Sequence, residues 1–386
     1  MKILLIAYHY PPAGAIAAQR TGAMAKHLAR MGYAVSVITA APATTKSIGA
    51  SRPQSIQDPI RLLQALPRRI LSRLLLPDAA VLWSLRVAIR PAPPHDVVLA
   101  SGPPFSAFIA ARVLSWRYGT TWVADYRDLW TASPYYRGGR LRKFLDRRIE
   151  RHLLQHACGL TTVSKPLLTD LERQHGRSGA QVRNGFEPDD FVGLDPWRPT
   201  LGPLRIVYCG EIYEGKRDPT LLFRAAHTLG LSGADIRFEF YGSSVSSLSA
   251  IAAREGVESL VSFHPRVSHR TSLQLQLHAD ALLLLMWCDR REDGVYSGKI
   301  FEYLGAQRPV LIVGLESNVA AQLVREGGAG WVIDTEAKAV AALQEALARK
   351  AAGGPQPLSP PTQDLTRGNQ IEALGQYLNS VGDSHV

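Results

Sequence analysis

The residues best suited to chemistry lie in the segment 294–304, where glycines and a hydroxyl precede a short amphipathic stretch, GVYSGKIFEYL. A helix that begins near Lys299 would gather free backbone N–H groups, the positive end of the helix dipole and an ammonium group around one anion. Glu302 lies three residues further on the same face, where its carboxylate could accept hydrogen bonds from sugar hydroxyls. The segment predicts a phosphate site, although an ordinary surface Lys/Glu pair has the same spacing.

Other charged and polar residues follow predicted strands, and ligands of open α/β sheets bind beyond the carboxyl ends of strands. In chain order these candidates are His9, Arg20, Asp125, Arg127, Asp128, Gly210, Lys216 and Arg217. Asp125 and Asp128 could orient or deprotonate a hydroxyl. Alternatively, Asp128 caps a helix and Asp125 forms an ion pair with Arg127 between domains. Ser243 and Ser244 also follow a strand, and they suit either a base contact or a turn.

Strand-like apolar runs alternate with helix-like segments, a pattern typical of parallel sheets covered by helices. In the first half the predicted strands are 3–8, 34–39, 97–101, 121–125 and 160–163, and the predicted helices are 16–31, 105–118, 141–156 and 165–174. In the second half the predicted strands are 205–209, 237–241, 261–263, 281–287, 310–313 and 330–333, and the predicted helices are 219–229, 246–254, 270–277, 298–305, 318–325 and 335–350. The sequence therefore predicts an α/β protein with two Rossmann-like, doubly wound domains that face each other across a cleft.

The domain boundary is predicted at a stretch rich in proline and glycine, 193–203. This stretch would link an N-terminal domain, 1–192, to a C-terminal domain, 204–365. A last helix and tail would follow at 366–386.

Composition favours a globular protein of a reducing compartment. The chain has 386 residues, 46% of them hydrophobic, which is enough for two domains. Its cysteines, Cys158, Cys209 and Cys288, are far apart and suggest neither disulfides nor zinc. The apolar start is too short for a signal peptide, and no run approaches the roughly 20 residues of a membrane span. We therefore expect a cytoplasmic location.

Positive charge is concentrated in the first half of the chain. Residues 1–200 hold 27 Lys and Arg against 13 Asp and Glu, a net of +14, whereas residues 201–386 hold 17 against 20, a net of −3. Arginines and leucines alternate in 60–90, which includes Arg61, Arg68, Arg69 and Arg73, and cations crowd 137–151. Such segments could lie on an anionic membrane surface, or they could be solvated or packed helices. Nucleic acid is a weaker alternative, because no nucleic-acid motif accompanies them.

The loops together resemble the GT-B glycosyltransferases, and specifically the retaining glycosyltransferase family 4 (group 1). The motifs that carry the resemblance are Tyr-Pro-Pro at 10–12 with Arg20, ADYRDLW at 124–130, VRNGFEPDDF at 182–191, YCG at 208–210 with Lys216 and Arg217, FYG at 240–242, KIFEYL at 299–304 and GAGW at 328–331. They cover nearly the whole chain. The resemblance implies a nucleotide-sugar site in the C-terminal domain, an acceptor site in the N-terminal domain, and a C-terminal helix that returns to the N-terminal domain.

The resemblance also implies roles for individual residues. Glu302 matches the second glutamate of the family's pair, which binds the ribose, and Lys216 matches the basic residue that contacts the diphosphate. Donor-binding residues would be Gly14, Gly210, Lys216, Arg217, Tyr296, Ser297, Gly298, Lys299 and Glu302. From the positions of the loops, taken together with this resemblance, we expect His9, Arg20 and Arg127 to bind the acceptor and Asp125, Asp128, Lys216 and Glu302 to be catalytic. Gly14 lets a phosphate approach because it lacks a side chain.

Two positions depart from the family's pattern. Gly294 stands where the first glutamate of the pair is expected, directly after Glu292 and Asp293, so the usual contact to the donor sugar is missing or displaced. Glu211 stands where many members have arginine, which puts greater weight on the remaining cations.

The predicted reaction is displacement of a nucleoside diphosphate by an acceptor hydroxyl with retained configuration, as in surface polysaccharide or glycolipid biosynthesis. Cations and amides aimed at the leaving diphosphate would stabilise the transition state, and no metal is expected because no DxD follows a strand. The expected partners are the nucleotide sugar and a carbohydrate or lipid-linked acceptor, with an anionic membrane surface at the cytoplasmic face. The alternatives are a GT-B sugar-nucleotide epimerase and a non-catalytic nucleotide-sugar-binding protein. A NAD-dependent dehydrogenase is disfavoured, because no GxGxxG follows a strand.

Overall fold

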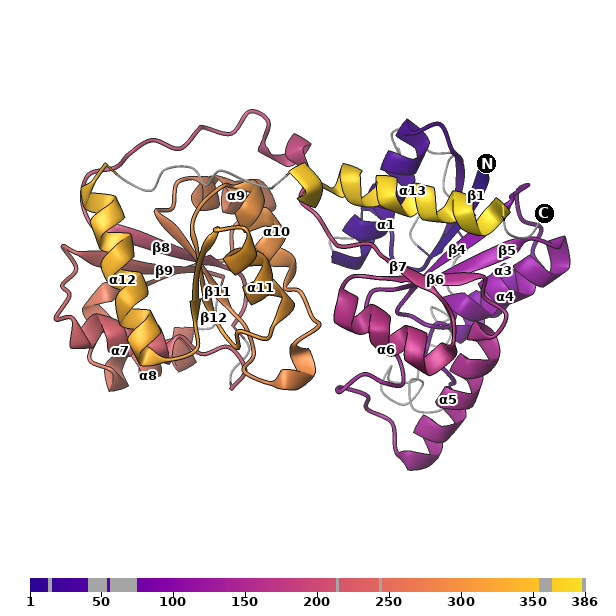
Figure 1. Cartoon of the computed structure of the whole chain (residues 1–386), viewed down its shortest axis with the longest axis horizontal. Helices are drawn as coiled ribbons and strands as arrows, with labels where there is room; N and C mark the ends of the chain where they lie inside the picture. Colours follow the sequence, from indigo (N-terminus) through magenta and orange to yellow (C-terminus); the bar gives the residue numbers. More distant parts are fainter. Residues whose placement is uncertain are drawn as a thin grey trace. The chain divides into compact units, whose positions relative to one another are not determined.

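Two units make up the protein. The computed structural model describes residues 1–12, 16–40, 54–55, 75–212, 215–242, 245–353 and 363–383. The N-terminal unit comprises Met1–Asn184 and Arg367–Val386, and the C-terminal unit comprises Gly185–Thr366 (Figure 1). Residues 185–192 belong to the C-terminal unit in this division, whereas the predicted N-terminal domain, 1–192, includes them.

The N-terminal unit is built on a parallel sheet of seven described strands in the order β3-β2-β1-β4-β5-β6-β7. Their bounds are β1 Lys2–Ala7, β2 Ala34–Thr39, β3 Gln54–Ser55, β4 Val97–Gly102, β5 Thr121–Tyr126, β6 Gly159–Thr162 and β7 Gly179–Gln181. The central strands β1, β4 and β5 are buried almost throughout, as expected for strands covered on both faces. Of the seven, β3 and β7 were not predicted from the sequence.

Helices cover both faces of this sheet. They are α1 Ile16–Arg30, α3 Val81–Ile89, α4 Ala107–Tyr118, α5 Arg140–Leu154, α6 Lys165–His175 and α13 Arg367–Asp383. Residues of α3, α4, α5 and α6 share one core with the sheet, and residues of α1 and α13 share the other. The last helix of the chain thus packs on the N-terminal unit beside α1, as the resemblance implies (Figure 1).

The C-terminal unit repeats this architecture with six described parallel strands in the order β10-β9-β8-β11-β12-β13. The strands are β8 Leu204–Cys209, β9 Ile236–Tyr241, β10 Val261–His264, β11 Ala281–Leu285, β12 Val310–Val313 and β13 Gly330–Ile333. The α-helices are α7 Thr220–Thr228, α8 Val245–Arg254, α9 His269–Leu277, α10 Gly298–Gly305, α11 Val319–Glu326 and α12 Glu336–Ala351. Short 3-10 turns lie at Pro188–Phe191, Glu258–Leu260, Arg290–Glu292 and Gln363–Leu365.

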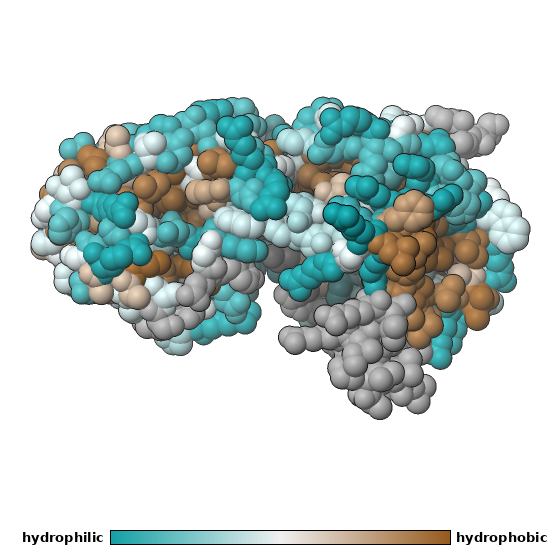
Figure 2. Space-filling model, turned by 90° about the horizontal axis from the view of Figure 1, so that it is seen from below, coloured by the Kyte–Doolittle hydropathy of each residue, from teal (hydrophilic) through white to brown (hydrophobic). Residues whose placement is uncertain are grey.

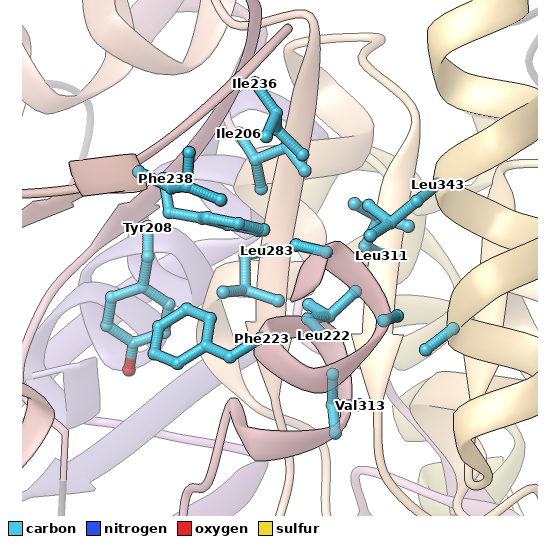
Figure 3. Packing of buried hydrophobic residues seen from close by; sticks show 14 of the residues in the cluster. Ile206, Tyr208, Leu222, Phe223, Ile236, Phe238, Leu283, Leu311, Val313 and Leu343 are labelled. Atoms are coloured by element: carbon cyan, nitrogen blue, oxygen red, sulfur yellow. The ribbon is translucent and has the colours of Figure 1, made fainter. Parts of the chain in front are cut away.

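Aromatic and branched side chains fill the core of the C-terminal unit. On one face, β8, β9 and β11 pack against α7, α8 and α12, with Phe223 and Phe238 at the centre (Figure 3). On the other face, α10 contributes Ile300, Phe301 and Leu304, which fixes the rotation of this helix about its axis. That rotation turns Lys299 and Glu302 away from the core.

The order of the strands defines the edge at which a ligand site is expected. In the N-terminal unit the direction of winding reverses between β1 and β4, and in the C-terminal unit it reverses between β8 and β11. Loops after such strand pairs diverge and leave room for a ligand at the carboxyl edge of the sheet. No helix in the described part of the chain is long and apolar enough to cross a membrane.

Candidate functional site

In the C-terminal unit, Lys299 lies against the chain that leaves β8. Its Nζ is 5.1 Å from the centroid of the Tyr208 ring. Gly210 follows β8 with a φ of 126°, and a Cβ at this position would lie 2.7 Å from Cε and 2.8 Å from Nζ of Lys299. Gly210 is therefore needed both for its backbone conformation and for the approach of Lys299.

The environment of Lys299 lowers the pKa of its ammonium group. Burial is the larger cause and Arg217 the second, and together they lower the pKa of Lys299 from 10.5 to about 8, with Glu302 acting in the opposite direction. A partly desolvated cation beside a second cation is stabilised by an incoming anion. The arrangement suits a diphosphate.

Two further cations lie on the loop after β8. Nζ of Lys216, which is exposed, lies 4.4 Å from the centroid of the Trp287 ring, and Trp287 follows β11. Arg217 donates through Nη1 to the Tyr208 hydroxyl at 3.4 Å and to the carbonyl of Glu211 at 3.2 Å. The predicted cations Lys216, Arg217 and Lys299 thus lie around the carboxyl ends of β8 and β11.

Glu302, one turn after Lys299, is held by two side chains of α9. Its Oε1 lies 3.3 Å from Nε2 of His269, and its Oε2 accepts from Nε2 of Gln276 at 3.1 Å. Burial favours the neutral acid, but these two hydrogen bonds outweigh it and lower the pKa of Glu302. The carboxylate is ionised, oriented and still 27% exposed, so it can accept hydrogen bonds from a ligand.

The loop before α10 is fixed by Asn318. Its Nδ2 donates to the carbonyl of Glu292 at 2.9 Å, and the adjacent Val319 N–H donates to the carbonyl of Asp293 at 2.8 Å. Gly294, where the family glutamate is expected, is buried. Among the described residues, Oδ1 of Asp293 is buried without a hydrogen-bond partner.

The remaining residues of the opening segment begin α10. Tyr296 packs with its ring centroid 5.4 Å from that of Phe301. Ser297 occupies the N-cap position with no capping hydrogen bond from its side chain, and Gly298 is the first helical residue. These bounds agree with the helix predicted at 298–305.

In the N-terminal unit, Asp125 and Arg20 form an internal ion pair. Arg20 donates from Nη2 to Oδ1 of Asp125 at 2.7 Å and from Nε to Oδ2 at 3.2 Å. Ser101 and Thr161 donate to the same carboxylate at 2.8 and 2.9 Å. Asp125 is fully buried, and the hydrogen bonds together with the charge of Arg20 lower its pKa despite burial.

This pair bears on the predicted roles of Asp125 and Arg20, and it corrects the predicted ion-pair partner of Asp125. Asp125 has no exposed atom to offer a substrate, and Arg20 is 6% exposed with its guanidinium also bound to the carbonyl of Val182 at 3.0 Å. Their geometry fits a positioning role for both, in place of the catalytic and acceptor-binding roles. The ion-pair partner of Asp125 is Arg20, not Arg127.

His9, Arg127 and Asp128 lie on the loops after β1 and β5. Arg127 donates to the carbonyls of Gly102, at 3.1 Å, and Pro103, so it is anchored to the loop after β4. Burial and the charge of Arg127 lower the pKa of His9, which favours a neutral imidazole. Asp128 is exposed. These three predicted residues share the carboxyl edge of β1, β4 and β5.

Several contributors were not predicted from the sequence. His269 and Gln276 orient Glu302, Asn318 fixes the loop before α10, and Tyr208 and Trp287 lie beneath the cations. His269 could have been found from the sequence, because it lies at the start of the helix that follows β10. Gly14, Ser243 and Ser244 lie outside the described residues, as do Arg61, Arg68, Arg69 and Arg73. Across the described ranges, no group of three His, Cys, Asp or Glu side chains is arranged to hold a metal ion.

Solved structures share this architecture along the whole chain. Sucrose-phosphate synthase from Thermosynechococcus elongatus matches with a TM-score of 0.60 at 15% identity, over 100% of this chain and 97% of that chain. The lipopolysaccharide outer core galactosyltransferase WaaB matches with a TM-score of 0.62 at 13% identity, over 98% and 99%. HepE from Anabaena, solved in complex with UDP, matches with a TM-score of 0.62 at 14% identity, over 100% and 98%. The fold is therefore that of the GT-B glycosyltransferases.

The sequence itself carries a family signal in its first half. Residues 17–185 match the model of the glycosyl transferase 4-like domain, and no curated protein sequence matches the chain. The chain thus combines a match to the glycosyl transferase 4-like domain in its first half with the GT-B fold over its whole length.

Proposed function

We propose that this protein is a glycosyltransferase that moves a sugar from a nucleotide-sugar donor to a carbohydrate or lipid-linked acceptor, with retained configuration, in surface polysaccharide or glycolipid biosynthesis. It would act at the cytoplasmic face of a membrane. The observation that carries the proposal is the convergence of Lys299, Gly210 and Glu302 at the carboxyl edge of β8 and β11. This edge combines the partly desolvated ammonium of Lys299, the absence of a side chain at Gly210 and the oriented carboxylate of Glu302.

In the proposed donor complex, the diphosphate lies among Lys299, Lys216 and Arg217, near the first amides of α10. Negative charge grows on the diphosphate as the bond to the sugar breaks, so these groups stabilise the transition state more than the ground state. Glu302 accepts hydrogen bonds from the ribose. No metal is required, because the cations of the protein supply the charge. Asp293, whose Oδ1 has no partner among the described residues, is our candidate for the sugar contact missing at Gly294.

On the acceptor side we assign His9, Arg127 and Asp128. The neutral imidazole and the exposed carboxylate can orient the attacking hydroxyl. A phosphate oxygen of the leaving group takes the proton of that hydroxyl, so no protein nucleophile is needed. The buried ion pair of Asp125 and Arg20 positions the carboxyl edge of β1, β4 and β5 that carries these residues.

Two structural neighbours support the donor and acceptor classes. HepE from Anabaena is described in complex with UDP and in complex with UDP and glucose. WaaB is described as a galactosyltransferase of the lipopolysaccharide outer core. Both proteins are only 13 to 14% identical to this chain, so we use them to choose the ligands for the test below.

The test is a thermal-shift panel of UDP, GDP and ADP, alone and as sugar conjugates, with and without EDTA. A ligand at 100 times its Kd stabilises the folded protein by about 2.7 kcal/mol. That corresponds to an increase of roughly 5 to 10 °C in the melting temperature of a unit of this size. We expect one nucleoside series to give this increase, and EDTA to leave it unchanged.

Variants locate the effect. Glu302→Ala and Lys216→Ala should abolish most of the increase. The control variants in the same unit, Glu326→Ala at an exposed position and Lys338→Ala at a side chain that is 42% exposed, should retain it. If no nucleotide raises the melting temperature, or if all four variants respond as the wild type does, the proposed donor site is wrong. Acceptor-dependent release of the nucleoside diphosphate then separates transfer from epimerisation of the donor.

A further inference from the structure

Helix α5 packs Leu153 and Leu154 into the core near its end, but nearer its start it exposes apolar side chains, and it buries two carboxylates. Leu141 is 72% exposed, Phe144 53% and Leu145 38%, whereas Asp146 and Glu150 are each 1% exposed. Large apolar side chains gathered at a surface mark contact with another apolar phase. Figure 2 shows such residues gathered on the N-terminal unit.

The buried carboxylates have partners inside the unit, which explains why the helix is held in this rotation. Glu150 accepts from the Tyr126 hydroxyl at 3.0 Å through Oε1 and from the Thr131 hydroxyl through Oε2. Asp146 accepts from the Tyr136 hydroxyl and lies 3.6 Å from Nε of Arg142. Turning α5 over to bury its apolar residues would break these bonds, each of which involves a charged group.

Arginines surround the exposed apolar residues of α5, and three of them have no carboxylate partner among the described residues. Arg140, Arg147 and Arg151 are exposed and form no ion pair within the part of the chain that the structure describes. Arg148 lies over the Phe144 ring, with Cζ 5.4 Å from the centroid. The outer face of α5, formed by Arg140, Leu141, Phe144, Leu145, Arg147, Arg148 and Arg151, is therefore apolar and strongly positive together.

We propose that the outer face of α5 docks the protein on an anionic lipid surface. Arginines at the level of the headgroups and leucine and phenylalanine below them match the two layers of such an interface. The described helices include none that crosses a membrane, so attachment by this face is peripheral. A polyanion such as nucleic acid would use the arginines but gain little from exposed leucines, which is why lipid is the favoured occupant.

Docking would also set the position of the acceptor edge. The Glu150 carboxylate of α5 accepts hydrogen bonds from Tyr126 and Thr131, which flank the loop of Arg127 and Asp128. This loop is therefore rigidly connected to the docked helix. Resting on the proposed function, this consequence favours an acceptor carried by lipid over one that is free in solution.

The test is flotation of the full chain with vesicles of phosphatidylcholine containing 30% phosphatidylglycerol, and with phosphatidylcholine alone. The charge variant is Arg147→Glu/Arg151→Glu, and its matched control is Arg237→Glu/Arg325→Glu on exposed positions of the other unit, with the same change in net charge. The apolar variant is Leu141→Ser/Phe144→Ser. Heparin binding of every variant is measured in parallel.

The wild type should float with the anionic vesicles only. Because one basic residue contributes about fivefold to partitioning, the charge variant should lose at least 25-fold and the control far less. The apolar variant should lose about tenfold with vesicles and bind heparin as the wild type does. Equal loss in the charge variant and its control, or no loss in the apolar variant, would overturn the proposal.

Nucleotide binding in solution serves as the folding control. The variants on α5 lie outside the donor site and should bind nucleoside diphosphate as the wild type does. A protein that floats but binds no nucleotide refutes the proposed function alone, and one that binds nucleotide but does not float refutes the docking alone.

Discussion

The ammonium group of Lys299 should make donor binding depend on pH in a range where few other groups titrate. Burial and Arg217 lower its pKa from 10.5 to about 8. A bound diphosphate favours the charged form of the lysine, so the pKa rises in the complex. Above pH 8 binding must therefore take up a proton, and affinity must fall.

The size of the effect follows from this pKa. Affinity should change little below pH 7.5 and fall about tenfold between pH 7 and pH 9, about 1.4 kcal/mol. The pKa of the Cys209 thiol is raised to about 11, mainly by burial, so this neighbour does not titrate in the same range. The phosphate groups of the ligand are already ionised above pH 7.

The stability of the unliganded protein should change in the opposite direction. The charged lysine is disfavoured in the folded state, so its cost, roughly 3 kcal/mol, is present below pH 8. It disappears as the pH rises from about 8 to 10.5, because the unfolded chain binds more protons there. Melting temperatures alone would mix the two effects, and the affinity must be measured directly.

The assay is titration calorimetry of the nucleoside diphosphate that binds best, from pH 7 to pH 9, in two buffers of different ionisation enthalpy. Lys299→Met should bind weakly at every pH, and Lys299→Arg should bind with a flat profile because arginine stays charged. A flat profile for the wild type, or wild-type affinity in Lys299→Met, would refute the assigned role of this lysine.

Three further predictions concern the rest of the structure. Asp125→Ala should lower the free energy of unfolding by about 3 to 5 kcal/mol, because it leaves the buried guanidinium of Arg20 unpaired. The control Asp128→Ala should change it by no more than about 0.5 kcal/mol. Calorimetric unfolding compares the two variants, and equal melting temperatures would contradict the buried pair. Glu302→Gln should weaken nucleoside diphosphate binding about 10- to 100-fold by removing a charged hydrogen-bond acceptor, a loss that calorimetric titration would detect; unchanged affinity would exclude a ribose contact. Gly159→Ala should lower the free energy of unfolding by about 1 to 3 kcal/mol, because its Cβ would lie 2.0 Å from the Tyr377 hydroxyl of α13. In the control Gly139→Ala, nothing lies within 4 Å of the corresponding Cβ. Thermal unfolding of the two variants tests the docking of α13.

The fold was predictable because its signal is local. Strands such as β4 and β11 are buried on both faces, so they are continuous apolar runs in the sequence. Helix α10 was also predicted with its bounds, because its four buried residues recur at helical spacing. The rotation of α5 was not predictable, since it depends on Tyr126 and Thr131, whose hydroxyls donate to the buried carboxylate of Glu150.

The candidate site was predictable in its location but not in every role. Most of the chosen residues lie in loops after strands, with Asp125 inside β5 and Arg20 on α1. Sequence alone does not tell which polar side chains at that edge point inward. Asp125 and Asp128 are three residues apart, and one is sealed by Arg20, 105 positions away, while the other is exposed. Pairing across such separations is decided by tertiary packing, which no local pattern records.

Glu302 shows what distinguishes a ligand-binding carboxylate from a structural one. Asp125 has four side-chain hydrogen bonds and no exposure, so its stabilising interactions are complete within the fold. Glu302 has one hydrogen bond to each oxygen and keeps 27% of its side chain exposed. A carboxylate oxygen can accept more than one hydrogen bond, so Glu302 has acceptor capacity left for a sugar hydroxyl and Asp125 does not. This difference, more than residue type or position after a strand, is the reason that the donor assignment rests on Glu302 while Asp125 is assigned to the scaffold.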